Sequence, residues 1–168
     1  MRLLCPMFDS SRMVRQYVTD VYLPAAAHFE AVSAANYQGA KDLASWRSRV
    51  QGSWDGVKVD GIEAVLGEVA WVGETAMVTA NIHLGELNPA DIKAEIIYGR
   101  IGPDGTLEKA GTAPMSEKKD LGGGAHVFQG SCPFARAGKM GFTLRVTPAH
   151  AQLNHPAHGG RCLVVTGG

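Results

Sequence analysis

The chain has 168 residues, and its 16 Lys and Arg side chains balance its 16 Asp and Glu side chains. This length allows one ordinary domain or a small domain with an appendage, which sets a ceiling of two units. The zero net charge, without a cluster of Lys or Arg, argues against a surface for nucleic acid or anionic membranes.

The cysteines and the N-terminal residues predict a soluble cytoplasmic protein. Cys5, Cys132 and Cys162 are an odd number without a C-x-x-C pair, which favours reduced thiols over a disulfide framework. Residues 1–8 are apolar but are broken at Pro6, and they lack the apolar region and cleavage site of a signal peptide. No run of the sequence approaches the roughly 20 apolar residues of a membrane span.

The first predicted element is a helix that begins near Arg12. Asp9 or Ser10 can cap its start, since both side chains accept hydrogen bonds from the backbone of a first turn. Its apolar residues recur at three- and four-residue spacing and form one stripe, made of Val14, Tyr17, Val18, Val21 and Tyr22. Leu23-Pro24 is predicted to end this helix, because proline disfavours helical geometry in the residue before it.

A second helix is predicted to run to about Gln51. Helical spacing relates its apolar residues, which are Phe29, Val32, Ala40, Leu43, Trp46 and Val50. Its charged residues occupy other faces, and they are Glu30, Lys41, Asp42, Arg47 and Arg49. Gly39 weakens the middle of this helix by about 1 kcal/mol relative to alanine. We therefore expect a two-helix segment over residues 1–53.

After Gly52 the apolar period changes from 3.6 to 2, which places the domain boundary near Ser53 to Gly56. Strands with one apolar face are predicted near residues 57–62, 77–84, 92–98, 107–110, 126–130, 139–147 and 162–166. About seven strands are typical of an immunoglobulin-like sandwich, although the Cys…Trp…Cys core is missing. The predicted fold is mainly β, a two-helix segment followed by an antiparallel immunoglobulin-like β-sandwich over residues 54–168.

Histidines supply one hypothesis for a site. Of the six histidines, His150, His155 and His158 are spaced loosely like metal ligands, and Cys162 lies near enough to complete a set. No zinc template fits this spacing, and the surrounding Pro and Gly residues are typical of a surface loop. We assign no metal-binding residue and rank a metal site below the other hypotheses.

No catalytic residue is predicted. Gly122 to Gly124 lacks a following Lys-Ser/Thr and a helix, which favours a flexible hairpin loop over a phosphate cradle. A G-x-S-x-G motif is missing, and Cys132 before Pro133 is typical of a small buried thiol. Three acidic residues near one turn, Glu86, Asp91 and Glu95, are expected to be solvated charges.

Tryptophans supply another hypothesis, an aromatic platform for sugar rings. Trp46 is in helical register with Leu43 and Val50, which favours core burial. Trp54 and Trp71 flank the boundary and the first loop of the sandwich, where they are expected to seal the contact between helix and sandwich. Exposed aromatic residues do mark binding surfaces, so glucan binding by the sandwich stays open.

Several stretches resemble one known family, the α-glucan (glycogen) phosphorylases. The residues PMFDSSRMVRQYV from Pro6 to Val18, followed by Tyr22 to Ala25, are similar to the C-terminal part of these enzymes. The resemblance is to the bacterial and archaeal branch with a C-terminal extension, and it includes the Trp46-x-x-x-Val50 pattern. In the sandwich it is carried by Leu84 to Ile92, Tyr98-Gly99, Ala113 to Met115 and Gly138 to Pro148. It covers the chain from about Leu3 to His150.

The resemblance implies phosphorolysis of α-1,4-glucans to glucose 1-phosphate, with pyridoxal phosphate bound to a lysine. In that family the cofactor lysine and the phosphate- and glucan-binding residues precede the stretch that Arg12 to Val14 matches. No catalytic, cofactor-binding or metal-binding residue is therefore carried onto this sequence, and Met1 is expected to fall within a helix of a longer enzyme. The implied partner is the catalytic lobe of the enzyme, and an α-glucan and a homo-oligomer are further candidates.

Two hypotheses from different classes follow. The first is a C-terminal fragment of an α-glucan phosphorylase, a glycosyltransferase, in which the helices brace the catalytic lobe and the sandwich serves packing, orientation or assembly. The second is a stand-alone glucan-binding module. The apolar stripe of the first predicted helix favours the first hypothesis, because a segment of two helices does not cover such a stripe fully.

Overall fold

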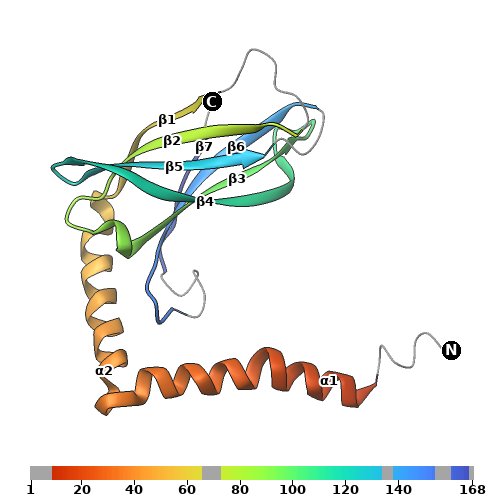
Figure 1. Ribbon diagram of the computed structural model, residues 1–168, viewed down its shortest axis with the longest axis vertical. Coiled ribbons are helices and arrows are strands. Elements are labelled where there is room, and N and C mark those ends of the chain that lie inside the picture. Colours follow the sequence, from red (N-terminus) through yellow and green to blue (C-terminus); the bar gives the residue numbers. More distant parts are fainter. Residues whose placement is uncertain (1–8, 66–72, 134–137, 154–159, 167–168) are drawn as a thin grey trace. The chain divides into compact units, whose positions relative to one another are not determined.

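The structure, a computed structural model, describes residues 9–65, 73–133, 138–153 and 160–166 (Figure 1). The chain forms two compact units, residues 1–46 and residues 47–168. The domain boundary between residues 53 and 54 stays a prediction. Among the described residues, no helix is long and apolar enough to cross a membrane.

The first unit is helical. α1 (Ser10–Tyr17) begins after Asp9, whose side chain accepts a hydrogen bond from the Ser11 N–H at 3.2 Å, as the predicted cap requires. A π-helical segment, η2 (Val18–Tyr22), follows, and α2 (Leu23–Ser53) continues from it. The helical part of the chain therefore starts where the sequence predicts, close to Arg12.

The helix end predicted at Leu23-Pro24 is wrong. Leu23 has helical φ and ψ of −65° and −46°, and its N–H donates to the Val18 carbonyl, five residues back. Proline lacks an N–H and crowds the carbonyl four residues before it. The π turn changes the hydrogen-bond register at this point, so helical geometry passes through Pro24.

The interruption of helical geometry lies further along, at residues 34–37 of α2. Ala34 has a ψ of 156°, and Ala35, Asn36 and Tyr37 have φ values of 48°, 59° and 61°. Positive φ is uncommon outside glycine, and it reverses the hand of the backbone. Gly39, predicted to weaken the helix, lies two residues beyond this interruption.

The second unit is mainly β and antiparallel, as predicted. Its strands are β1 (Lys58–Val65), β2 (Thr75–His83), β3 (Ile92–Ile101), β4 (Leu107–Gly122), β5 (Ala125–Pro133), β6 (Met140–Pro148) and β7 (Leu163–Thr166). Two short 3-10 helices precede β1 and β3, namely η3 (Trp54–Gly56) and η4 (Pro89–Asp91). Each predicted strand is present, and β4 is much longer than predicted, at 16 residues.

The strands form one sheet in the order β1-β2-β5-β4-β3-β6-β7. β4 pairs with β3 through Leu107 to Pro114, and with β5 through Met115 to Gly122. In Figure 1, β4 lies between β5 and β3. This strand therefore joins two halves of the sheet, β1-β2-β5 on one side and β3-β6-β7 on the other.

The apolar core comes from alternate residues of the inner strands. It includes Val78, Ala80 and Ile82 of β2, Ala94 and Ile96 of β3, Phe128 of β5, and Leu144 and Val146 of β6. A Cβ placed on Gly130 of β5 would lie 3.0 Å from Ile96 Cδ1, so the two halves of the sheet meet at this point. The alternation predicted for β2 is confirmed.

The glycine run makes the predicted hairpin connection between β4 and β5. Gly122, Gly123 and Gly124 all have positive φ, at 81°, 64° and 81°. The Leu84 N–H donates to the Gly124 carbonyl at 2.7 Å, and a Cβ on Gly124 would lie 2.6 Å from the Gly85 carbonyl oxygen. The backbone of this turn thus packs directly on the backbone that follows β2.

Candidate functional site

Exposed apolar side chains gather on the first unit, where they follow α1 and η2. Their exposed fractions are 50% for Met13, 56% for Val14, 53% for Tyr17, 38% for Val18, 48% for Val21 and 63% for Tyr22. We call these six residues the apolar helix face. Contiguous apolar surface of this kind marks an interaction site in soluble proteins.

A groove of about 320 Å³ lies on the apolar helix face, lined by Met13, Gln16, Tyr17, Asp20 and Val21. The hydroxyl of Thr19 donates to the Arg15 carbonyl at 3.0 Å, where the helix changes to its wider π turn. Three of the groove's five lining residues are Met, Tyr and Val, and the other two supply one amide and one carboxylate. The groove can therefore take an apolar side chain of a partner, and Gln16 and Asp20 can form hydrogen bonds with polar groups beside that side chain.

In the second unit, an ion pair joins the last turns of α2 to the sheet. Arg49 Nη1 and Nη2 donate to the two Asp91 carboxylate oxygens at 2.7 and 2.8 Å, and this contact raises the pKa of Arg49. Asp91 is buried and also accepts a hydrogen bond from the Asn88 N–H at 2.9 Å. Val50 and Trp54, close to Arg49 in sequence, are buried as well. A bidentate, partly buried ion pair between arginine and a carboxylate fixes the orientation as well as the position of a helix end.

A second buried carboxylate lies in the middle of β3. Glu95 accepts hydrogen bonds from Arg145 Nη2 at 2.7 Å and from Arg145 Nε at 3.3 Å, and it pairs with Lys93. Burial by itself raises the pKa of Glu95, but the hydrogen bonds from Lys93 and Arg145 outweigh it and hold the pKa below its ordinary value. The group is therefore ionised at neutral pH, as a structural ion pair requires.

The expectation that three neighbouring acidic residues are solvated is wrong for two of them. Glu86 is exposed, whereas Asp91 and Glu95 are each 6% exposed. Sequence reasoning missed both because their arginine partners are 42 and 50 residues away along the chain. For Asp91 a signal was present, since Asn88-Pro89-x-Asp91 is the pattern of a capped helix start.

The tryptophans that the structure describes are buried. Trp46 is 6% exposed and Trp54 is 7% exposed, so neither presents a ring to a sugar. Trp71, the remaining member of the hypothetical platform, lies outside the described residues. The structure therefore offers no sugar platform at Trp46 or Trp54.

Two of the four histidine and cysteine candidates lie in the part of the chain that the structure describes. That part includes His150 and Cys162, and within it no group of three His, Cys, Asp or Glu side chains has metal-binding spacing. His155 and His158 lie outside those residues. Cys162 is exposed, whereas Cys132 is buried, and burial raises the pKa of the Cys132 thiol.

Comparison with known proteins identifies relatives along most of the chain. The family model described as glycogen phosphorylase C-terminal domain matches residues 54–165. The chain is 31% identical over 151 residues to the glycogen phosphorylases of Mycobacterium tuberculosis (strain CDC 1551 / Oshkosh) and Mycobacterium bovis (strain ATCC BAA-935 / AF2122/97). It is 26% identical over 157 residues to the maltodextrin phosphorylase of Thermococcus litoralis. No solved structure matches the chain significantly.

These alignments cover the chain and the relatives very unequally. They include 89% of this chain for the mycobacterial proteins and 90% for the Thermococcus protein, but 18% of each relative. The chain therefore spans less than a fifth of the length of the curated relatives that it matches.

Proposed function

The chain belongs to the glycogen phosphorylase C-terminal domain family, and from this membership we propose that it works as the C-terminal part of an α-glucan phosphorylase. Its contribution is structural: the first, helical unit (residues 1–46) binds the catalytic lobe, and the second unit, the sheet unit (residues 47–168), serves packing, orientation or assembly. The observation that carries this proposal is the exposed apolar helix face, which needs a partner surface.

The reaction of the intact enzyme is the phosphorolysis of α-1,4-glucan to glucose 1-phosphate, a glycosyl transfer in the cytoplasm. Its cofactor, pyridoxal phosphate, requires a lysine set in a pocket. The lysines whose burial the structure describes are all exposed, namely Lys41, Lys58, Lys93, Lys118, Lys119 and Lys139. The described residues thus do not fit the cofactor, and no step of the reaction is assigned to this chain.

The partner of the apolar helix face is the catalytic lobe of the same enzyme. The relatives contain more than four-fifths of their length outside the matched part, since the match includes 18% of each, and this is ample surface for the contact. Val14, Tyr17 and Val21 lie on one stripe, so one apolar strip on the lobe would cover them together. Gln16 and Asp20 at the groove provide hydrogen bonds that fix the register of the contact.

The strand order of the sheet unit supports an immunoglobulin-like connectivity. Its halves read β1-β2-β5-β4 and β3-β6-β7, which corresponds to the ABED and CFG strand order of constant-type immunoglobulin domains. β4 departs from that plan because it also pairs with β3. Such sandwiches present loops and sheet faces for assembly, which supports a role in positioning and homo-oligomer formation rather than in chemistry.

The alternative, a stand-alone glucan-binding module, has weaker support. It needs exposed aromatic rings, and Trp54 is 7% exposed. Calorimetry with maltooligosaccharides tests it, with Trp71→Ala as the informative variant. Heat at millimolar sugar that disappears in this variant would favour the alternative over the structural role.

A binding experiment tests the docking proposal directly. The purified chain is mixed with the mycobacterial glycogen phosphorylase lacking its C-terminal matched part, and complex formation and phosphate-dependent release of glucose 1-phosphate are measured. We expect a complex that Val14→Ser, Tyr17→Ser and Val21→Ser together weaken by at least about tenfold, since three apolar contacts are lost. Substitution of the exposed residues Ser11→Ala and Arg15→Ala provides the control.

Two results would contradict the proposal. One is glucose 1-phosphate release by the isolated chain, with or without pyridoxal phosphate. The other is a complex whose affinity is the same for the triple serine variant and for the control.

A further inference from the structure

Residues 34–37 combine a strained backbone with a position between two regular helical stretches. Three consecutive residues without a glycine, Ala35, Asn36 and Tyr37, have φ between 48° and 61°. A left-handed conformation costs energy at each such residue, because Cβ approaches the following carbonyl oxygen. Asparagine tolerates it best, and alanine and tyrosine tolerate it poorly.

Little in the described structure holds these residues in that conformation. All four are exposed, and Tyr37 has 54% of its surface exposed. Within the described part of the chain, no side-chain hydrogen bond or ion pair involves residues 34–37. A strained segment normally persists where its surroundings over-determine it, and side-chain hydrogen bonds and ion pairs supply no such support at the described residues 34–37.

A second conformation competes with the left-handed turn, and it is the continuous helix. Ala34 and Ala35 have the highest helix propensity of any residue type, and helical stretches lie on both sides. Asn36 and Gly39 oppose this helix, because asparagine competes for backbone hydrogen bonds and glycine loses more entropy. Residue preferences in this segment are therefore divided, because alanine favours the helix and asparagine tolerates the turn.

The flanking regions are better held than this segment. Before it, helical geometry runs without interruption from Ser10 through Pro24. After it, the last turns of α2 are fixed to the sheet by Arg49 and Asp91, with Val50 buried beside them. Within α2, the backbone leaves helical geometry at residues 34–37.

We propose that residues 34–37 form a hinge, which reorients the apolar helix face relative to the sheet unit by exchange between a left-handed turn and a continuous helix. Hinges in proteins are a few residues that absorb a large change in φ and ψ. In the intact enzyme, a consequence that rests on the proposed function, the sheet unit would move while the apolar helix face stays bound to the catalytic lobe.

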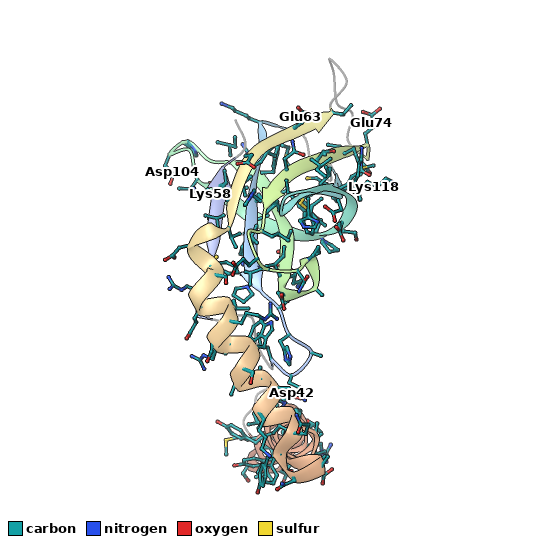
Figure 2. The ribbon with its side chains drawn as sticks, turned by 90° about the vertical axis from the view of Figure 1, so that its left-hand side faces the viewer. Asp42, Lys58, Glu63, Glu74, Asp104 and Lys118 are labelled. Atoms are coloured by element: carbon teal, nitrogen blue, oxygen red, sulfur yellow. The ribbon has the colours of Figure 1, made fainter. Side chains whose placement is uncertain are left out.

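Distance distributions between two spin labels test the hinge in the 168-residue chain itself. One label is placed at Glu30→Cys, before the hinge, and the other at Lys118→Cys on β4, in a background with Cys5→Ser, Cys132→Ala and Cys162→Ser. A control pair at Glu63→Cys and Lys118→Cys lies entirely within the sheet unit, and Figure 2 labels both side chains. Both Glu30 and Lys118 are exposed.

Two sets of substitutions are expected to shift the main distribution in opposite directions. Asn36→Ala, Tyr37→Ala and Gly39→Ala favour the continuous helix and narrow the distribution to one distance, with a gain of helical circular dichroism. Asn36→Gly and Tyr37→Gly relieve the left-handed strain and increase the bent population. Each change shifts the ratio of the two populations by up to about fivefold.

The control pair must keep its distance in every variant, which shows that the sheet unit is intact. If both sets of variants keep the distance distribution of the parent chain, or move it in the same direction, the hinge does not exist. This outcome leaves the docking proposal untouched, because the catalytic lobe takes no part in the experiment.

Discussion

At Gly124 two independent constraints act on a single residue. Its φ of 81° strains any side chain, and a Cβ there would lie 2.6 Å from the Gly85 carbonyl oxygen. Gly123 beside it has a φ of 64°, but a Cβ placed there would meet no described atom within 4 Å, so only the first constraint applies. A substitution at Gly123 therefore tests backbone strain alone, whereas a substitution at Gly124 tests backbone strain together with the packing on Gly85.

Alanine substitutions at these two glycines measure that difference. We expect Gly123→Ala to lower the free energy of unfolding by about 1 kcal/mol, the cost of a left-handed alanine. Gly124→Ala should cost about 1–3 kcal/mol more, because the backbone after β2 has to move. Denaturant unfolding followed by tryptophan fluorescence checks both values, and equal costs would show that the turn does not pack on Gly85.

Glu95 predicts how stability changes with pH. Its pKa in the folded chain is lowered, so its contribution is fully present above the ordinary carboxyl pKa of about 4.3 and is lost as pH falls through the lower folded value. We expect the wild-type chain to be about 1–3 kcal/mol more stable than Glu95→Gln at pH 7. The difference should shrink steadily below about pH 4. Unfolding curves measured from about pH 3 to pH 7 check this, and a difference that grows on acidification would contradict the lowered pKa.

Among the elements, the end of α2 forms an ion pair with Asp91, which lies 42 residues away in the sequence. A double-mutant cycle with Arg49→Ala and Asp91→Ala should give a coupling free energy of about 1–2 kcal/mol, since Arg49 is partly exposed while Asp91 is buried. Arg47→Ala, on an exposed position of the same helix, is the matched control and should be additive with Asp91→Ala. Coupling that is indistinguishable from that of the control would show that this pair does not hold the helix end.

The helices show which element boundaries the sequence predicts and which it does not. The start near Ser10 is predictable, because Asp9 caps it through a contact two residues away. The end predicted at Leu23-Pro24 is wrong, because a π turn spanning five residues accommodates the proline. The interruption at residues 34–37 has no proline to mark it, and only Gly39 indicates weakness nearby.

For the molecule as a whole, the exposed apolar helix face predicts that the isolated chain self-associates. In the isolated chain, this exposed surface should cause self-association as concentration rises, because association removes apolar area from water. Val14→Ser, Tyr17→Ser and Val21→Ser together should raise the dissociation constant by at least about tenfold in sedimentation velocity runs. Ser11→Ala with Arg15→Ala should leave it unchanged, and association that is insensitive to the triple variant would assign it to another surface.

The sequence alone determined the class of each region and the family. Helical and strand periods depend on neighbours within one or two turns, so residue spacing predicts the mainly β second unit, the seven strands of its described residues and the helical start. The resemblance to α-glucan phosphorylases is equally local, since it depends on stretches of residues in order.

Only the tertiary structure decided which polar residues are buried and how the strands are joined. Asp91 and Glu95 resemble solvated charges in the sequence, because a carboxylate carries no local sign of an arginine more than about 40 residues away. The length of β4, and its pairing with both β3 and β5, likewise depends on strands far apart in the chain. Pairing between distant strands depends on the packing of the whole sheet. The free energy of that packing cannot be inferred from a short stretch of sequence.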